Sequence, residues 1–270
     1  TQSDPDPDQA YGEDGSDVVF GGGADDTISG GPGFDTVTYY PSPLGVTVDL
    51  LAGTSTGWGI DALDTIEGVN GSRHNDVLYG SDGLNQLFGD DGDDFMDGRG
   101  GEDILGGGCG AVITTCYADN GSDTMIGGEG NDTFNDYGIY TPPLGSPAGD
   151  PDTMDGGPGT DTVSYYPSGD YVVANLATGV VQTKGVVTNV LTSTDTLSNI
   201  ENLIGTFRND QITGSDVPNR ILGGQGNDTI SGLGGNDELF PGAGDDTVSG
   251  GDGDDGVFAN GDPGLKFLLG

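Results

Sequence analysis

The sequence predicts an all-β fold in which short strands and tight turns alternate to wind a solenoid. Two observations carry this prediction: a nine-residue repeat that recurs along the 270-residue chain, and an apolar residue at the eighth place of every repeat. The last three places are typical of a very short strand whose middle side chain points inward. The glycine-rich first six places are typical of a turn. Two such units would complete one coil, and each coil would pair with its neighbours.

The repeats form five uninterrupted runs that together contain 17 units. Their sixth place is aspartate in fifteen units and asparagine, Asn85 and Asn219, in the other two. The nine-residue period therefore carries two signals, one for an apolar core and one for rows of carboxylates. The runs cover residues 12–38, 71–106, 118–135, 147–164 and 205–258.

The charge balance is strongly one-sided. The chain has 45 acidic and 6 basic residues, a formal net charge of −39, 55 glycines and a hydrophobic fraction of 32%. This composition is typical of a disordered polyanion, but the regular spacing of the apolar residues argues against disorder. The negative charge excludes nucleic acid as a partner. No apolar run approaches the roughly 18 residues of a membrane-spanning helix.

The stacked aspartates predict bound cations. Aspartates 18 residues apart, such as Asp228 and Asp246, should lie about 4.8 Å apart, the spacing of neighbouring strands. Bare carboxylates at that distance repel by about 1 kcal/mol even in water. The turns offer only carboxylate and carbonyl oxygens, which favour Ca²⁺ over Mg²⁺ and Zn²⁺. We therefore expect each aspartate to be half of a calcium site that the next coil completes, so that folding and metal binding form one equilibrium.

Several repeats resemble a known family. GGPGFDTVT (30–38), GGEGNDTFN (127–135), GGPGTDTVS (156–164) and GGQGNDTIS (223–231) match G-G-x-G-x-D-x-U-x, the nonapeptide of RTX, or hemolysin-type calcium-binding, proteins. The resemblance implies a right-handed parallel β-roll, or β-helix solenoid, that is secreted from bacteria to the cell surface or an extracellular matrix. It also implies multiple Ca²⁺ ions held between turns on the same edge, while Asn85 and Asn219 weaken that expectation at their own turns.

The resemblance assigns the calcium ligands to the sixth-place aspartates and to turn glycines, through their carbonyl groups. The aspartates are Asp17, Asp26, Asp35, Asp76, Asp94, Asp103, Asp123, Asp132, Asp152, Asp161, Asp210, Asp228, Asp237, Asp246 and Asp255. The glycines are Gly31, Gly33, Gly128, Gly130, Gly157, Gly159, Gly224, Gly226, Gly242, Gly244, Gly251 and Gly253.

The chain is expected to form one elongated body with two similar halves. TVTYYPS (36–42) recurs as TVSYYPS (162–168), and IEGVNGSRHNDVLYGSDGLNQLFG (66–89) aligns with IENLIGTFRNDQITGSDVPNRILG (200–223). We interpret this as a duplicated module with a coil inserted in each copy. The expected parts are an acidic arm or linker (1–11), a first half (12–135) with an inserted coil (39–70), a second half (136–258) with an inserted coil (165–204), and a C-terminal cap or tail (259–270).

The only two cysteines, Cys109 and Cys116, lie in an insertion at 107–117 that interrupts the repeats. Their isolation predicts a disulfide that closes a surface loop in an oxidising compartment, with two free thiols as the alternative.

Catalysis has weak support in the sequence. GTSTG (53–57) fits the nucleophile elbow G-x-S-x-G, with Asp61 or Asp64 and the single histidine, His74, following in hydrolase order. The elbow requires a strand, a turn and a helix, and the chain shows no helical periodicity. We predict no enzyme and no catalytic residue.

Aromatic side chains leave a carbohydrate surface open as an alternative. Trp58 and the pairs Tyr39–Tyr40 and Tyr165–Tyr166 could stack on sugars, although aromatic residues in such insertions more often plug the coil.

The main functional prediction is a secreted, calcium-binding structural protein that folds on Ca²⁺. It would assemble end to end through its N-terminal arm and C-terminal tail, or within an extracellular layer or matrix. A calcium-dependent module of a larger secreted adhesin or enzyme is the alternative, and a carbohydrate-binding or hydrolytic protein is a third possibility.

Overall fold

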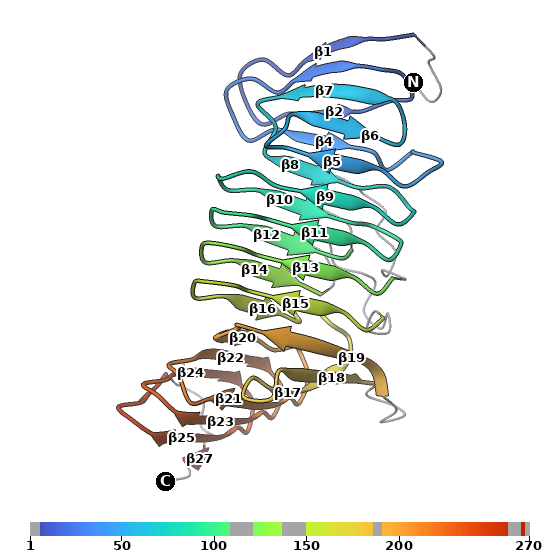
Figure 1. The fold of residues 1–270 in the computed structure, drawn as a ribbon. Helices are drawn as coiled ribbons and strands as arrows, with labels where there is room; N and C mark the ends of the chain where they lie inside the picture. The colour runs from blue at the N-terminus through green and yellow to red at the C-terminus, as the bar shows by residue number, and fades with distance from the viewer. Residues whose placement is uncertain (1–5, 109–120, 137–149, 186–190, 259–265, 268–270) are drawn as a thin grey trace.

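The structure, a computed structural model, describes residues 6–108, 121–136, 150–185, 191–258 and 266–267. These ranges contain strands and turns and no helix, and thus no helix long and apolar enough to cross a membrane. The strands form two long sheets whose coils stack along one axis (Figure 1). The predicted all-β roll is confirmed.

Sheet A has 16 strands and sheet B has 11. Sheet A contains, in spatial order, β1 (Gln9–Tyr11), β3 (Thr27–Ser29), β7 (Ile60–Asp64), β6 (Thr54–Thr56), β5 (Thr47–Asp49), β9 (Val77–Tyr79), β11 (Phe95–Asp97), β13 (Thr124–Ile126), β15 (Thr153–Asp155), β19 (Leu191–Ser198), β18 (Val180–Lys184), β17 (Tyr171–Asn175), β21 (Gln211–Ser215), β23 (Thr229–Gly234), β25 (Thr247–Asp252) and β27 (Lys266–Phe267). Sheet B contains β2 (Val18–Phe20), β4 (Thr36–Thr38), β8 (Gly68–Asn70), β10 (Gln86–Phe88), β12 (Ile104–Gly106), β14 (Thr133–Asn135), β16 (Thr162–Ser164), β20 (Asn202–Ile204), β22 (Arg220–Gln225), β24 (Glu238–Ala243) and β26 (Gly256–Val257).

The core is a narrow column of eighth-place side chains between the two sheets. Leu78 of β9 pairs with Met96 of β11, and Leu87 of β10 pairs with Leu105 of β12. All four are fully buried. Burial of one such side chain stabilises the fold by roughly 1.5–3 kcal/mol, and the nine-residue period supplies two of them to each coil.

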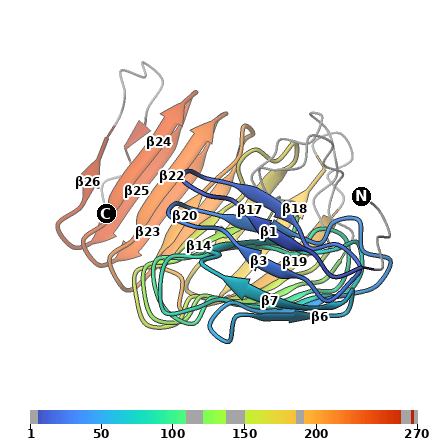
Figure 2. The same cartoon turned by 90° about the horizontal axis from the view of Figure 1, so that it is seen from above.

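The two predicted insertions add antiparallel meanders to sheet A alone. From β4 the chain enters β5, which pairs with β9 further along the stack, and then returns through β6 to β7, which pairs with β3. Strands β17, β18 and β19 follow the same route between β21 and β15. Sheet B stays parallel throughout and runs unbroken from β2 to β26, so both halves share one stack. Viewed from above, the strands from β22 to β26 lie to one side of the earlier coils (Figure 2).

Tyrosine side chains plug the coil at both insertions. Tyr39 follows β4 and Tyr165 follows β16, and both are fully buried. Tyr40 lies beneath Arg73, whose guanidinium carbon is 4.4 Å from the ring centroid, and the exposed Tyr166 contacts Phe207. Tyr39 and Tyr165 therefore plug the coil, as aromatic residues in such insertions more often do, and the alternative that these two rings stack on sugars is excluded because neither ring reaches the surface.

Candidate metal sites

Acidic side chains form two ladders along the turn edges of the solenoid. In most rungs, one carboxylate oxygen accepts the backbone N–H of the rung before it. The Asp228 N–H donates to Asp246 Oδ1 at 2.8 Å, and the Asp237 N–H donates to Asp255 Oδ1 at 3.0 Å. The predicted stacking of aspartates 18 residues apart is confirmed.

The rungs include every sixth-place residue of the repeats. The A-side ladder, at the edge that leads into sheet A, contains Asp8, Asp26, Asp61, Asp76, Asp94, Asp123, Asp152, Asp195, Asp210, Asp228 and Asp246. The B-side ladder contains Asp17, Asp35, Glu67, Asn85, Asp103, Asp132, Asp161, Glu201, Asn219, Asp237 and Asp255.

Five rungs lie outside the repeats from which the metal ligands were predicted. Four of them, Asp61, Glu67, Asp195 and Glu201, come from the two insertions and carry the ladders past each meander. A shared pattern, D-x-L-x-x-I-E at 61–67 and 195–201, could have revealed these four. Asp8 is the fifth, and its N–H donates to Asp26 Oδ1 at 2.8 Å.

Many rungs leave their second carboxylate oxygen buried without a partner. In the described part of the chain, the Oδ2 atoms of Asp94, Asp103, Asp132, Asp161, Asp228 and Asp237 accept no hydrogen bond. All six side chains are buried, at 0–3% exposure. A buried polar atom without a partner costs about 1–3 kcal/mol, and more when it is charged. These oxygens therefore favour a cation close to the turn.

Four turns differ because serine or threonine replaces glycine at the second place. The Ser72 N–H donates to Asp76 Oδ2 and its hydroxyl donates to Asp76 Oδ1 at 2.9 Å. Thr206 contacts Asp210 in the same way, from its N–H at 2.6 Å and its hydroxyl at 2.9 Å. Both carboxylate oxygens of Asp76 and Asp210 are thus hydrogen-bonded, and these turns offer no orphan atom to a metal.

The two asparagine turns are also closed by hydrogen bonds. Asn85 Oδ1 accepts the Ser81 N–H at 2.6 Å, and its Nδ2 donates to the Glu67 carbonyl at 3.1 Å. Asn219 accepts the Ser215 N–H at 2.7 Å and donates to the Glu201 carbonyl at 2.7 Å. The weaker expectation of metal at these turns agrees with this geometry.

Backbone conformation also distinguishes the four turns with serine or threonine at the second place from the other described repeat turns. The second place has a positive φ in the other described turns, for example 108° at Gly224 and 76° at Leu233. No positive φ occurs at the four serine and threonine positions. Glycine adopts this left-handed conformation without the steric cost that other residues incur. A positive φ at the second place, which glycine favours and Leu233 also adopts, therefore marks the turns that leave a carboxylate oxygen unpaired.

The unpaired carboxylates have raised pKa values because burial disfavours their charged form. Desolvation, followed by the charge of Asp123, raises the pKa of Asp94 to about 9. Desolvation also raises the pKa of Asp228 to about 8, with smaller contributions from Asp210 and Asp246. The pKa of Asp103 rises to about 7 for the same principal reason. At neutral pH these groups need either a proton or a cation beside them.

A first-place glycine leaves room for the carboxylate, and Gly223→Ala tests this. A Cβ atom at Gly223 would lie 2.4 Å from the Pro241 carbonyl oxygen and 2.5 Å from Asp228 Oδ2. We expect the variant to lower the melting temperature in saturating calcium by roughly 5 °C or more, because the adjacent turn must shift. Gly83→Ala is the matched control, since its nearest contact is at 3.9 Å. Equal melting temperatures for both variants would contradict this steric account.

Comparison with protein families gives the same repeat. The profile of the RTX calcium-binding nonapeptide repeat matches residues 4–37, 70–105, 117–137, 204–239, 213–248 and 242–263, more than half of the chain. The chain belongs to the RTX calcium-binding repeat family. Comparison with curated proteins finds no match. As an RTX protein, the chain is a calcium-binding β-roll.

The RTX turns present here fit calcium chemically. Each unpaired Oδ2 lies in a turn whose available ligands are carboxylate and carbonyl oxygens, and whose backbone stacks closely on the turn of the next coil. Ca²⁺ prefers several oxygen ligands at about 2.3–2.6 Å. A Cβ atom at Gly244 would lie 1.7 Å from the Gly226 carbonyl oxygen of the preceding coil, so only glycine allows this stacking. A bound ion would supply the positive charge that the buried carboxylates lack. Ligation by the turn carbonyls remains a prediction.

The cysteine pair and the G-x-S-x-G stretch of this RTX chain remain to be placed. Cys109 and Cys116 lie outside the described residues. Ser55, the central residue of the G-x-S-x-G stretch, lies in β6, where it is buried and donates to Asp61 Oδ2 at 2.6 Å. Because no helix follows it in the described ranges, the structural context of a nucleophile elbow is missing.

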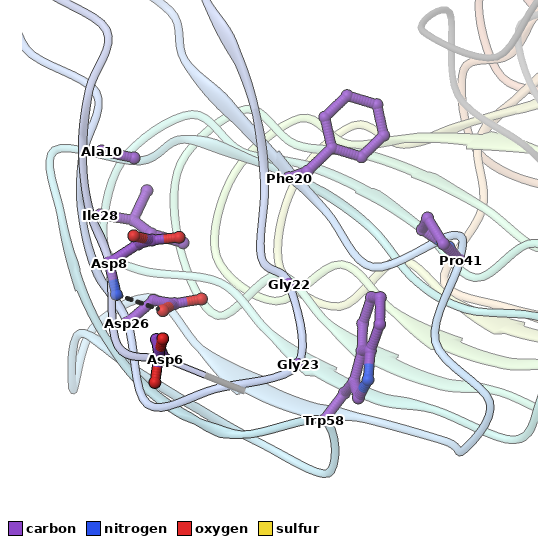
Figure 3. Close-up of a pocket in the computed structure, with 10 residues that line it drawn as sticks. All are labelled: Asp6, Asp8, Ala10, Phe20, Gly22, Gly23, Asp26, Ile28, Pro41 and Trp58. Carbon is purple, nitrogen blue, oxygen red and sulfur yellow. Dashed lines mark hydrogen bonds between the residues drawn. The ribbon is translucent and has the colours of Figure 1, made fainter. Parts of the chain in front are cut away.

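A cavity of about 390 Å³ lies among the N-terminal coils (Figure 3). Trp58, from the first insertion, and Asp6, Asp8 and Ala10, near the start of the chain, all line it. The lining residues are Asp6, Asp8, Ala10, Phe20, Gly22, Gly23, Asp26, Ile28, Pro41 and Trp58. A carbohydrate ligand at Trp58 remains an untested alternative.

Proposed function

We propose that this RTX protein is a secreted structural β-solenoid that folds when calcium binds at its glycine turns, by which we mean the repeat turns whose second place has a positive φ. The row of buried, unpaired Oδ2 atoms supports this proposal. Three ion pairs are found among the described residues, Arg73–Asp91, Arg99–Asp49 and Arg220–Glu238, and none of them includes a ladder carboxylate. Calcium is therefore the counter-charge that would make the ladders compatible with a folded chain.

Calcium availability would control when the chain folds. In a compartment with little free calcium, repulsion among the ladder carboxylates would keep the chain unfolded and competent for export. At millimolar extracellular calcium, binding to the folded state alone would shift the equilibrium by mass action.

End-to-end assembly is the second part of the proposal. The N-terminal coils expose Tyr11 at 65% and Phe20 at 62%, and Phe258, near the other end of the stack, is exposed at 45%. Exposed apolar side chains beside open strand edges favour pairing with another strand. We propose that residues 1–11 and 259–270 join one copy to the next. If a neighbouring domain of a larger adhesin or enzyme covers these surfaces instead, light scattering with calcium will detect only single short rods.

Asp228→Asn tests calcium binding at the glycine turns, with Asp210→Asn as its matched control. The two residues are adjacent rungs of the A-side ladder, but Thr206 already hydrogen-bonds to both oxygens of Asp210. We expect Asp228→Asn to bind at least one calcium ion fewer per chain and to need several-fold more calcium to fold. Asp210→Asn should bind as many ions as the parent. Equilibrium dialysis gives the ion count, and equal losses in both variants would contradict the assignment.

A further inference from the structure

Three buried carboxylates meet inside the solenoid beside the second meander. Asp136 follows β14, Asp152 precedes β15, and Asp195 lies within β19. One oxygen from each lies within 4.8 Å of the others, and the three side chains are 0–3% exposed. Asp136 and Asp195 belong to no nine-residue repeat, so the repeat pattern does not account for this cluster.

Asp136 points into the cluster with both of its carboxylate oxygens unpartnered in the described part of the chain. Asp195, in contrast, is fixed by its neighbours. Its Oδ1 accepts the Ser193 hydroxyl at 2.8 Å and the Asp152 N–H at 3.3 Å, and its Oδ2 accepts the Tyr165 hydroxyl at 2.9 Å. The cluster thus has two positioned carboxylates and a third that accepts no hydrogen bond from an N–H or hydroxyl group of the described residues.

No basic side chain neutralises these three groups among the described ion pairs, and the adjoining segment 137–149 contains no lysine or arginine. Burial, together with the charges of Asp195 and Asp152, raises the pKa of Asp136 well above its ordinary value. Three carboxylates this close and this deeply buried cannot all remain charged without a cation.

The first half of the chain contains the same arrangement without the third carboxylate. Asp26 and Asp61 correspond to Asp152 and Asp195, and the Asp26 N–H donates to Asp61 Oδ1 at 3.0 Å. Gly21, which follows β2, takes the position of Asp136. A Cβ atom there would lie 2.1 Å from the Tyr39 ring, so no side chain fits. Tyr39 donates to Asp61 at 2.7 Å, and Ser55 donates to it at 2.6 Å, which closes that network.

We propose that Asp136, Asp152 and Asp195 bind an additional calcium ion inside the roll, at a site distinct from the glycine turns. Two oxygens that lie about 2.4 Å from one ion are at most about 4.8 Å apart, which matches the spread of these atoms. A donor set made only of oxygen, without histidine or cysteine, selects a hard cation. Because Asp195 belongs to the meander and Asp152 to the repeats, the ion fastens the meander to the stack. The inference rests on the proposed calcium-dependent fold.

Asp136→Asn tests the site because it keeps the shape of the side chain and removes its charge. Equilibrium dialysis of the full chain with radiolabelled calcium should show one ion fewer per chain than in the parent, with strand content unchanged by circular dichroism. Asp82→Asn is the control, since Asp82 is exposed on a turn and its replacement removes the same charge. An equal ion count in Asp136→Asn and the parent would overturn the proposal.

Crystals of the unaltered chain grown in calcium chloride give a second test that does not depend on a variant that folds. An anomalous difference peak among Asp136, Asp152 and Asp195 is expected. Peaks at the glycine turns without one in this cluster would overturn the inference and leave the proposed function intact. A chain that binds no calcium anywhere would refute the proposed function itself.

Discussion

Removal of calcium at neutral pH is expected to abolish the strand signal of this protein in circular dichroism. The folded chain places carboxylates of both ladders in buried positions, and the Oδ2 atoms of Asp94, Asp132 and Asp228 have no protein partner in the described ranges. Without a cation, their desolvation and mutual repulsion exceed what a core two side chains wide supplies. Titration with calcium should restore the signal cooperatively, and magnesium at the same concentration should not.

Acid should partly replace calcium in this experiment. Burial raises the pKa of Asp94 to about 9 and that of Asp228 to about 8, so the folded chain binds more protons than the unfolded chain between about pH 4 and pH 9. This contribution to stability is present at low pH and is lost as the pH rises through those values. In chelator, the strand signal at pH 5 should therefore exceed that at pH 8. A chain that is fully folded in chelator at pH 8 would contradict the dependence on calcium.

Ile230→Asp is expected to be the most damaging single substitution. Ile230 is the second residue of β23, is 1% exposed, and pairs with Ile212 and Val248 of the neighbouring coils. The variant loses the burial of an isoleucine and places a charge where no partner can reach it, at a cost of at least about 4 kcal/mol. We expect the C-terminal coils to remain unfolded at calcium concentrations that saturate the parent, as measured by hydrogen exchange.

Thr229→Asp provides the control for that substitution. Thr229 precedes Ile230 in the same strand, but its side chain is exposed on the outer face of sheet A. The same new charge at this position should change the calcium midpoint by less than twofold, since surface substitutions usually alter stability by under about 0.5 kcal/mol. Equal damage from both substitutions would mean that net charge, and not burial, limits folding.

The repeating parts of the structure could be predicted from the sequence because one signal recurs in phase. Apolar residues at the eighth place, such as Leu87 and Leu105, mark the core, and sixth-place residues such as Asp228 and Asp246 mark the ladders. Each coil buries its apolar side chains and stacks its turns on the neighbouring coils in the same way, so a residue pattern that holds in one unit holds in the next.

The remaining features depend on contacts that a local pattern does not contain. The route of β5 past its neighbours to β9 is decided by pairing across the stack, and no turn residue encodes it. In the Asp76 turn, the Ser72 hydroxyl hydrogen-bonds to the carboxylate. In the sequence, a serine at this place looks like an ordinary deviation from the repeat, so this hydrogen bond could not be predicted. Asp136 belongs to no sequence motif. It can be recognised as part of a cluster only in the structure, where the pairing of β15 with β19 brings Asp152 and Asp195 beside it.

The two meanders also determine the shape of the molecule. At each one, sheet A gains three strands where sheet B gains only one, β8 in the first half and β20 in the second. Two extra strands lengthen one face by about 10 Å, so each meander acts as a wedge. The coils after the second meander turn away from the axis of those before it (Figure 1). A row of such subunits would trace an arc and not a straight line, and the handedness and radius of any fibre would be set by where these wedges fall along the chain.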